Sequence, residues 1–106
     1  MSIEELYPRV TEAIERAQAL VDAGDAIGAR RAYHEVFTIE SEIATKLAGS
    51  TIEGAIARCG AVRAALKANR PDLARNLALE YLEDRDLTPD AQAELRKVCD
   101  RASGLS

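Results

Sequence analysis

The sequence has few of the residue types on which most catalytic and metal sites depend. Its 106 residues include one histidine, two cysteines, no tryptophan and only 4% aromatic residues. Cys59 and Cys99 are too far apart in sequence for a paired metal-binding motif, and one histidine cannot complete a zinc site. The glycines fall at expected helix ends or inside helices and form no phosphate-binding loop. We therefore expect no enzymatic activity, no metal and no cofactor.

Positive charge and long apolar runs are also scarce. The chain carries 14 Lys and Arg against 18 Asp and Glu, a formal net charge of -4, which disfavours binding to a nucleic-acid backbone. No apolar run approaches the roughly 20 residues that span a bilayer. The first residues, Met-Ser-Ile-Glu-Glu-Leu-Tyr-Pro, lack the basic and apolar regions of a signal peptide. We expect a cytoplasmic protein whose partners are neither nucleic acid nor membrane.

The residues that are abundant favour helices. Hydrophobic residues make up 47% of the chain and charged residues 30%, a composition typical of one globular domain. Alanine is the commonest residue; it has the highest helix propensity and allows helices to approach closely. Apolar residues recur at helical spacing, and no segment alternates like a strand. We therefore predict a single all-α domain over residues 1–106, with about five helices.

Capping signals mark the first two helices. Ser2 with Glu5 fits a capping box at the start of the first helix. Gly24 is well placed to end that helix in a left-handed conformation, and Asp25 to cap the next. The second helix is expected from about Ala26 to Leu47.

Similar signals divide the rest of the chain. Gly49 is expected to end the second helix. The three later helices each begin with a capping residue or with a proline at the first helical position. These starts are Ser50 with Glu53, Pro71 with Asp72, and Thr88 with Pro89.

The helical spacing of apolar residues predicts the buried face of each helix. The expected core residues are Ile3, Leu6, Tyr7, Val10, Ile14, Ala17 and Val21 in the first helix; Ala29, Ala32, Tyr33, Val36, Ile43, Ala44 and Leu47 in the second; Ile52, Ala55, Ile56, Cys59, Val62 and Leu66 in the third; Leu73, Ala74, Leu77, Ala78 and Tyr81 in the fourth; and Ala91, Leu95, Val98 and Ala102 in the fifth.

Two stretches of the chain are built alike, Ala17 to Val36 and Ala61 to Tyr81. Each contains an amphipathic helix, a tight turn and a second helix that opens with a small residue where two backbones come close. The turns are residues 23–25 and 69–72, and the small residues are Ala29 and Ala74.

The first of these stretches resembles a tetratricopeptide repeat. The resemblance rests on the Gly24-Asp25 turn followed by Ala29 and Tyr33. The second stretch departs from the pattern, and the two units lie further apart than the ~34 residues of the family. The resemblance implies antiparallel helix pairs that hold a peptide or a partner helix in a groove. The alternative is an unrelated four-helix bundle with a capping helix. The second stretch departs from the tetratricopeptide pattern because Asn69 stands where the family has a glycine and Ala78 stands where it has an aromatic residue.

Three residues are candidates for partner binding: Phe37, Glu40 and Leu79. Glu40 falls within the apolar stripe of the second helix, where a buried carboxylate needs a partner. Either it forms a Glu–Arg pair with Arg58 or Arg63 that fixes helix register, or it grips a basic side chain of a partner. Phe37 and Leu79 lie beside the main stripes and would anchor a partner on the groove side of the second and fourth helices. The favoured function is an interaction module, or adaptor, that binds a partner's peptide or helix or another copy of itself.

His34 supports an alternative function. One exposed histidine on a four-helix bundle is the arrangement of histidine phosphotransfer domains, which would make His34 the phosphoacceptor. Glu35 follows it directly and would repel a phosphoryl group. A structural subunit of a larger assembly is a third possibility, and it predicts a defined homo-oligomer.

Overall fold

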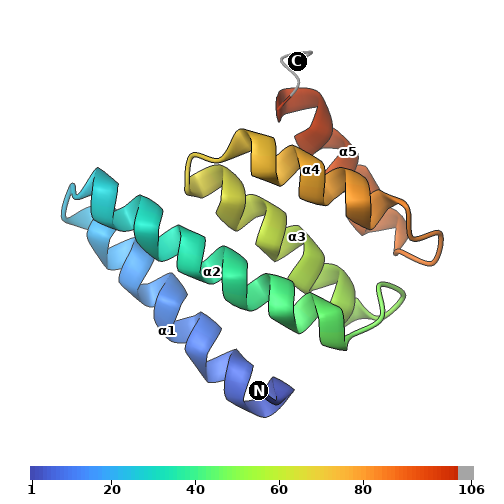
Figure 1. Ribbon diagram of the computed structural model, residues 1–106, viewed down its shortest axis with the longest axis horizontal. Coiled ribbons are helices and arrows are strands. Elements are labelled where there is room, and N and C mark those ends of the chain that lie inside the picture. The colour runs from blue at the N-terminus through green and yellow to red at the C-terminus, as the bar shows by residue number, and fades with distance from the viewer. Residues whose placement is uncertain (103–106) are drawn as a thin grey trace.

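The computed structural model describes residues 1–102, with the backbone alone at residue 102, and every regular element in that range is a helix. The chain forms α1 (Ile3–Asp22), α2 (Ala26–Lys46), α3 (Ile52–Lys67), α4 (Pro71–Leu82) and α5 (Pro89–Ala102). The helices lie side by side, each running opposite to the one before it (Figure 1). The predicted all-α fold with antiparallel helix pairs is confirmed.

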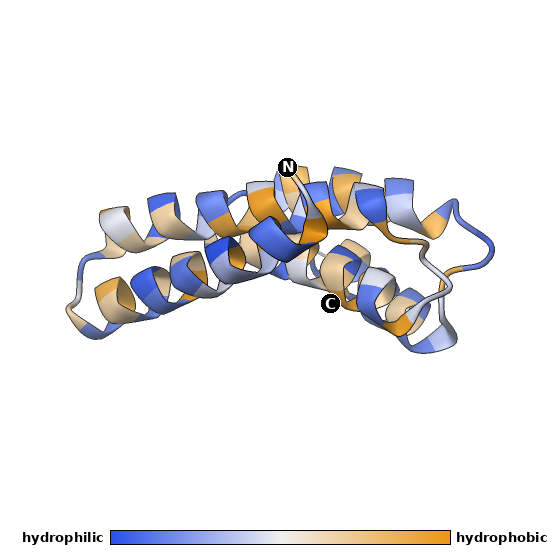
Figure 2. Ribbon diagram, turned by 90° about the horizontal axis from the view of Figure 1, so that it is seen from below, coloured by the Kyte–Doolittle hydropathy of each residue, from blue (hydrophilic) through white to orange (hydrophobic). Residues whose placement is uncertain are grey.

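The five helices form an open row in two layers. In Figure 1, α2 and α4 lie toward the viewer and α1, α3 and α5 lie behind them. The molecule measures 40 × 37 × 17 Å and is therefore about two helices thick. Within residues 1–102, α1 packs on α2 alone, whereas α3 packs on α2, α4 and α5. Figure 2 shows the row from its edge as an arch, and we call the side formed by the odd-numbered helices the α1–α3–α5 face.

None of the helices described here is both long enough and apolar enough to pass through a lipid bilayer.

The core consists of two clusters that meet at α3. The first lies between α1, α2 and α3 and contains Leu6, Val36 and Ile43; the second lies between α3, α4 and α5 and contains Val62 and Leu95. The residues that α3 contributes are mostly alanines. Ala57 and Ala64 belong to the first cluster, together with Ala68 directly after the helix, and Ala55 and Ala65 belong to the second. Alanine on both sides of α3 lets neighbouring helices approach it closely.

The turns after α1 and α3 have the same geometry. Gly24 has φ 77° and Asn69 has φ 61°, so both adopt the left-handed conformation. The N–H of Asp25 donates to the carbonyl of Leu20 at 3.0 Å, and the N–H of Arg70 donates to that of Ala65 at 2.9 Å. In each case the acceptor is the carbonyl oxygen of the residue five positions before the donor, which is the pattern of a Schellman motif. The predicted turns at Gly24 and Asn69 are therefore confirmed.

The boundary between α2 and α3 differs from the prediction. α2 ends at Lys46 with an extended Leu47, before Gly49 is reached. Thr51, one position later than the expected Ser50, caps α3, and its Oγ1 accepts a backbone N–H at 3.0 Å. The expected end of the fifth helix, Gly104, and the side chain of Ala102 lie outside the described residues.

Several large apolar residues that were expected in the core are exposed, and this expectation is wrong. On α1 the buried face is Leu6, Val10, Ala13 and Ala17. α1 has neighbours on only one side, and the residues of its second apolar stripe face solvent. The exposed side chains are Tyr7, Ile14 and Val21 on α1 and Ile52 and Ile56 on α3.

The exposed isoleucines of α3 have a different cause from the exposed residues of α1. This helix has packing partners on two sides, and most of its buried residues are glycine or alanine. Small residues let the neighbouring helices approach closely on those two sides, and the two isoleucines occupy the side of α3 that has no neighbour.

Candidate functional site

Two hollows lie on either side of α3. The α3–α5 hollow has a volume of about 250 Å³, and the α1–α3 hollow, floored by α2, has a volume of about 200 Å³. Ile56 and Arg63 line both of them, so a single ridge on α3 separates the two spaces. The α3–α5 hollow is lined also by Ile52, Ala55, Cys59, Thr88, Asp90, Ala91 and Glu94, and the α1–α3 hollow by Ile14, Gln18, Tyr33, Val36, Glu40, Gly60, Ala64 and Lys67.

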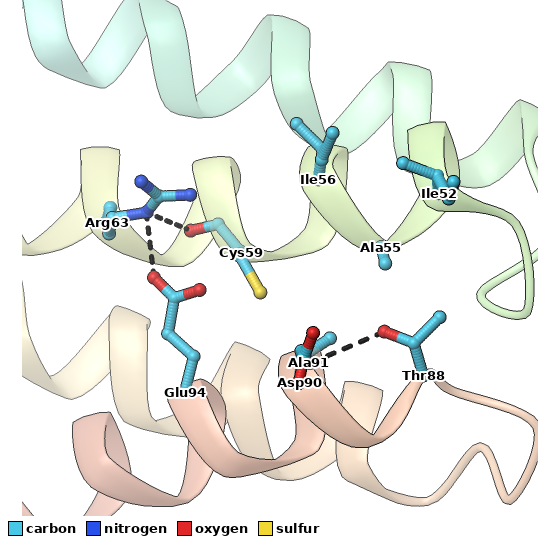
Figure 3. A pocket seen from close by; sticks show the side chains of 9 residues that line it. All are labelled: Ile52, Ala55, Ile56, Cys59, Arg63, Thr88, Asp90, Ala91 and Glu94. Atoms are coloured by element: carbon cyan, nitrogen blue, oxygen red, sulfur yellow. Dashed lines mark hydrogen bonds and ion pairs between the residues drawn. The ribbon is translucent and has the colours of Figure 1, made fainter.

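An ion pair closes one end of the α3–α5 hollow (Figure 3). The Nε of Arg63 donates to Glu94 Oε1 at 3.0 Å and to the carbonyl oxygen of Cys59 at 3.4 Å. Both charged side chains are about half exposed, so the pair contributes little to stability. It does hold the Arg63 guanidinium on the α5 side of the ridge.

The thiol of Cys59 is held in its protonated form. Burial raises its pKa to about 12, and a hydrogen bond with Glu94 and the negative charge of that carboxylate add to the effect. A nucleophilic cysteine needs a lowered pKa. The geometry around Cys59 therefore favours an inert core residue.

The ridge itself is apolar and exposed. Ile52 retains 72% of its accessible surface and Ile56 retains 59%. Figure 3 shows both side chains on the edge of α3 that points away from α5. Ile14 of α1, 41% exposed, lies across the α1–α3 hollow from Ile56. Isoleucines gathered around two hollows form an exposed apolar patch, the kind of surface that marks a binding site.

Glu40 lies in the α1–α3 hollow against the backbone of α3. A Cβ atom on Gly60 would come within 3.1 Å of Glu40 Cδ and 3.2 Å of its Oε2, so the glycine leaves room for the carboxylate. Burial raises the pKa of Glu40 from 4.5 to about 7, and the positive charge of Arg63 lowers it in part. Of Arg58 and Arg63, the two partners expected from the sequence, Arg63 is the one whose charge acts on Glu40.

Arg58 is engaged elsewhere. Its guanidinium lies 5.5 Å from the centre of the Tyr81 ring, and its Nη1 donates to the carbonyl of Gly54 at 2.9 Å. In the part of the chain that the structure describes, Glu40 forms neither an ion pair nor a hydrogen bond.

The other predicted site residues do not join Glu40. Phe37 is half-buried and packs against both core clusters. Leu79 is 43% exposed on α4 and lines neither hollow. His34 is exposed on α2, with its ring centre 5.6 Å from that of Phe37. Phosphotransfer through His34 stays a prediction.

The ridge residues of the candidate site were assigned to the core from sequence. Ile52 and Ile56 fit the helical stripe as well as any core residue does. The signal that separates them is the number of alanines on the two other sides of the same helix, at positions 55, 57, 61, 64 and 65. A helix with small residues on two sides has two neighbours, and its large residues then lie outside both contacts.

Comparisons with protein-family models, with curated proteins and with solved structures find no match. Within residues 1–102, no three His, Cys, Asp or Glu side chains are grouped so as to hold a metal ion.

Proposed function

We propose that this protein is a small interaction module that binds a peptide or helix of a partner protein on its α1–α3–α5 face. The observation that supports this is the exposed Ile52–Ile56 ridge between two hollows. Covering apolar surface yields about 25 cal/mol per Å², and side chains of a partner that enter the hollows would cover the ridge from both sides.

The charges around the hollows suit the rim of such an interface. Asp90 and Glu94 line the α3–α5 hollow, Glu40 and Lys67 line the α1–α3 hollow, and Arg63 stands between them. In peptide and helix recognition, apolar anchors supply most of the affinity, and charges at the rim set orientation and register.

The proposed surface differs from the one favoured by sequence. The second and fourth helices were expected to carry it, through Phe37, Glu40 and Leu79. The surface proposed here includes Glu40, but Ile52 and Ile56 take the place of Phe37 and Leu79. The proposal retains the tetratricopeptide-like interpretation of helix pairs that present one face to a partner.

Selection of peptides tests this function directly. A displayed library of random dodecapeptides is selected on the wild-type protein, and the enriched peptides are measured against I52D and I56D. Each substitution places a charge on the ridge, and we expect at least a tenfold loss of affinity, about 1.4 kcal/mol. I27D is the matched control, because Ile27 is also 66% exposed but lines neither hollow.

Two results would contradict the proposal. One is the absence of any peptide that binds the wild type more tightly than I56D. The other is a defined homo-oligomer in sedimentation that I56D converts to a monomer, because the ridge would then be the contact between copies of this chain.

A further inference from the structure

The α1–α3 hollow combines apolar walls with one carboxylate. Ile14, Tyr33, Val36 and Ile56 supply the walls, and Glu40 projects into the hollow over Gly60. A lysine or arginine side chain has the same two parts, an aliphatic stem and a charged head. The shape and chemistry of the hollow are therefore complementary to a long basic side chain.

The cations that line this hollow are already engaged. Arg63 donates to Glu94 and to the carbonyl of Cys59. The Nζ of Lys67 lies 5.2 Å from the centre of the Tyr33 ring. Glu40 is the one acidic side chain that lines this hollow, and within residues 1–102 it has neither a hydrogen bond nor an ion pair.

An unpaired carboxylate in this position is costly for the free protein. Burial outweighs the attraction of Arg63 and raises the pKa of Glu40 to about 7. A cation brought in by a partner would meet a carboxylate that has already lost part of its solvation on folding. Pairing would then favour the ionised form of Glu40.

We propose that the α1–α3 hollow receives a lysine or arginine side chain of the bound segment, whose cation pairs with Glu40. This inference rests on the proposed function, since it names the part of the partner that the α1–α3–α5 face recognises. The ridge supplies apolar contact for the neighbouring residues of the segment, and Glu40 selects the basic one.

The test repeats the peptide selection on the wild type, E40Q and E42Q. Glu42 is an exposed glutamate on the same helix and serves as the matched control. We expect the wild type and E42Q to enrich peptides that share a lysine or arginine among apolar residues. E40Q keeps the shape of the side chain and removes its charge, so the basic residue should no longer be enriched.

A double-mutant cycle then isolates the pair. Replacing the shared basic residue of a selected peptide by methionine should weaken binding to the wild type about tenfold. The same replacement should have little effect on binding to E40Q. Circular dichroism of E40Q verifies that the variant is folded.

Several outcomes separate this inference from the proposed function. Peptides that lose affinity on I56D but share no basic residue, or share an acidic one, would leave the interface in place and overturn the role of Glu40. Equal affinity of a basic peptide for E40Q and the wild type would do the same. Failure of the wild type to enrich any peptide would overturn both proposals together.

Discussion

The carboxylate of Glu40 on α2 rests against the backbone of Gly60 on α3. A methyl group at position 60 would lie 3.1 Å from Glu40 Cδ, closer than an ordinary van der Waals contact. The missing side chain at position 60 therefore sets how deeply the carboxylate enters the α1–α3 hollow.

Substituting G60A should push the Glu40 carboxylate toward solvent by a few tenths of an ångström. We expect the pKa of Glu40 to fall from about 7 toward its ordinary value of 4.5, since a better solvated carboxylate ionises more easily. An NMR-detected titration of the Glu40 side chain measures this. An unchanged pKa would mean that the glycine does not control the position of the carboxylate.

The same substitution tests the contact through stability. Alanine is favoured over glycine inside a helix by about 1 kcal/mol, and displacement of Glu40 should offset part of that gain. In an E40A background the offset disappears, so the two substitutions should not be additive in chemical denaturation. Strict additivity would contradict the contact.

The substitution E40Q should change how stability depends on pH. The folded protein holds a proton on Glu40 up to about pH 7, whereas the unfolded chain releases it near 4.5. The wild type therefore loses stability as the pH rises through this window, and the loss is complete above it. Because the side chain is only partly buried, we expect a loss of about 1–2 kcal/mol.

Urea denaturation across that pH range checks the prediction. E40Q should lack this loss and should be more stable than the wild type above pH 7. E42Q, at an exposed position of the same helix, should follow the wild type. A wild type and E40Q that vary in parallel would show that Glu40 is fully solvated.

Ala74 should not tolerate a larger side chain. It is fully buried in the second core cluster, where α4 approaches α3. The substitution A74L should overpack this contact and lower the free energy of unfolding by about 1–3 kcal/mol. The control is N76L, at an exposed position of α4. Equal stability of A74L and N76L in chemical denaturation would mean that the helices separate easily.

The two cysteines should differ in reactivity. Burial and the neighbouring Glu94 raise the pKa of Cys59 to about 12, and burial also raises the pKa of Cys99, which is less buried. Only the thiolate reacts, so iodoacetamide should modify Cys99 first in the folded protein. Mass spectrometry of the digest reports both rates, and in denaturant they should become equal. Preferential modification of Cys59 would show that the α3–α5 hollow opens in solution.

The fold was predictable from sequence because its local signals agree with one another. The turn at Gly24, the cap at Asp25 and the proline at the start of α4 each mark a helix boundary through backbone chemistry that tertiary packing does not alter. The shift from Ser50 to Thr51 is of another kind, because two adjacent hydroxyl residues can each cap a helix and the sequence does not choose between them.

The candidate site was only partly predictable. Glu40 stands out because a carboxylate interrupts an apolar stripe, whatever the packing around it. Ile52 and Ile56 were assigned to the core because a helical stripe shows that one side of a helix is apolar and does not show which sides have neighbours. That information lies in how the five helices pack, which gives α3 the neighbours α2, α4 and α5.

The central place of α3 affects how the molecule unfolds. Because its alanines belong to both core clusters, neither half of the protein keeps a complete interior once this helix is lost. The two halves are therefore coupled through a single element, and unfolding should occur as one cooperative event instead of in separate steps. A partner segment seated on Ile56, which borders both hollows, would contact the element that joins the halves and so stabilise the whole chain at once.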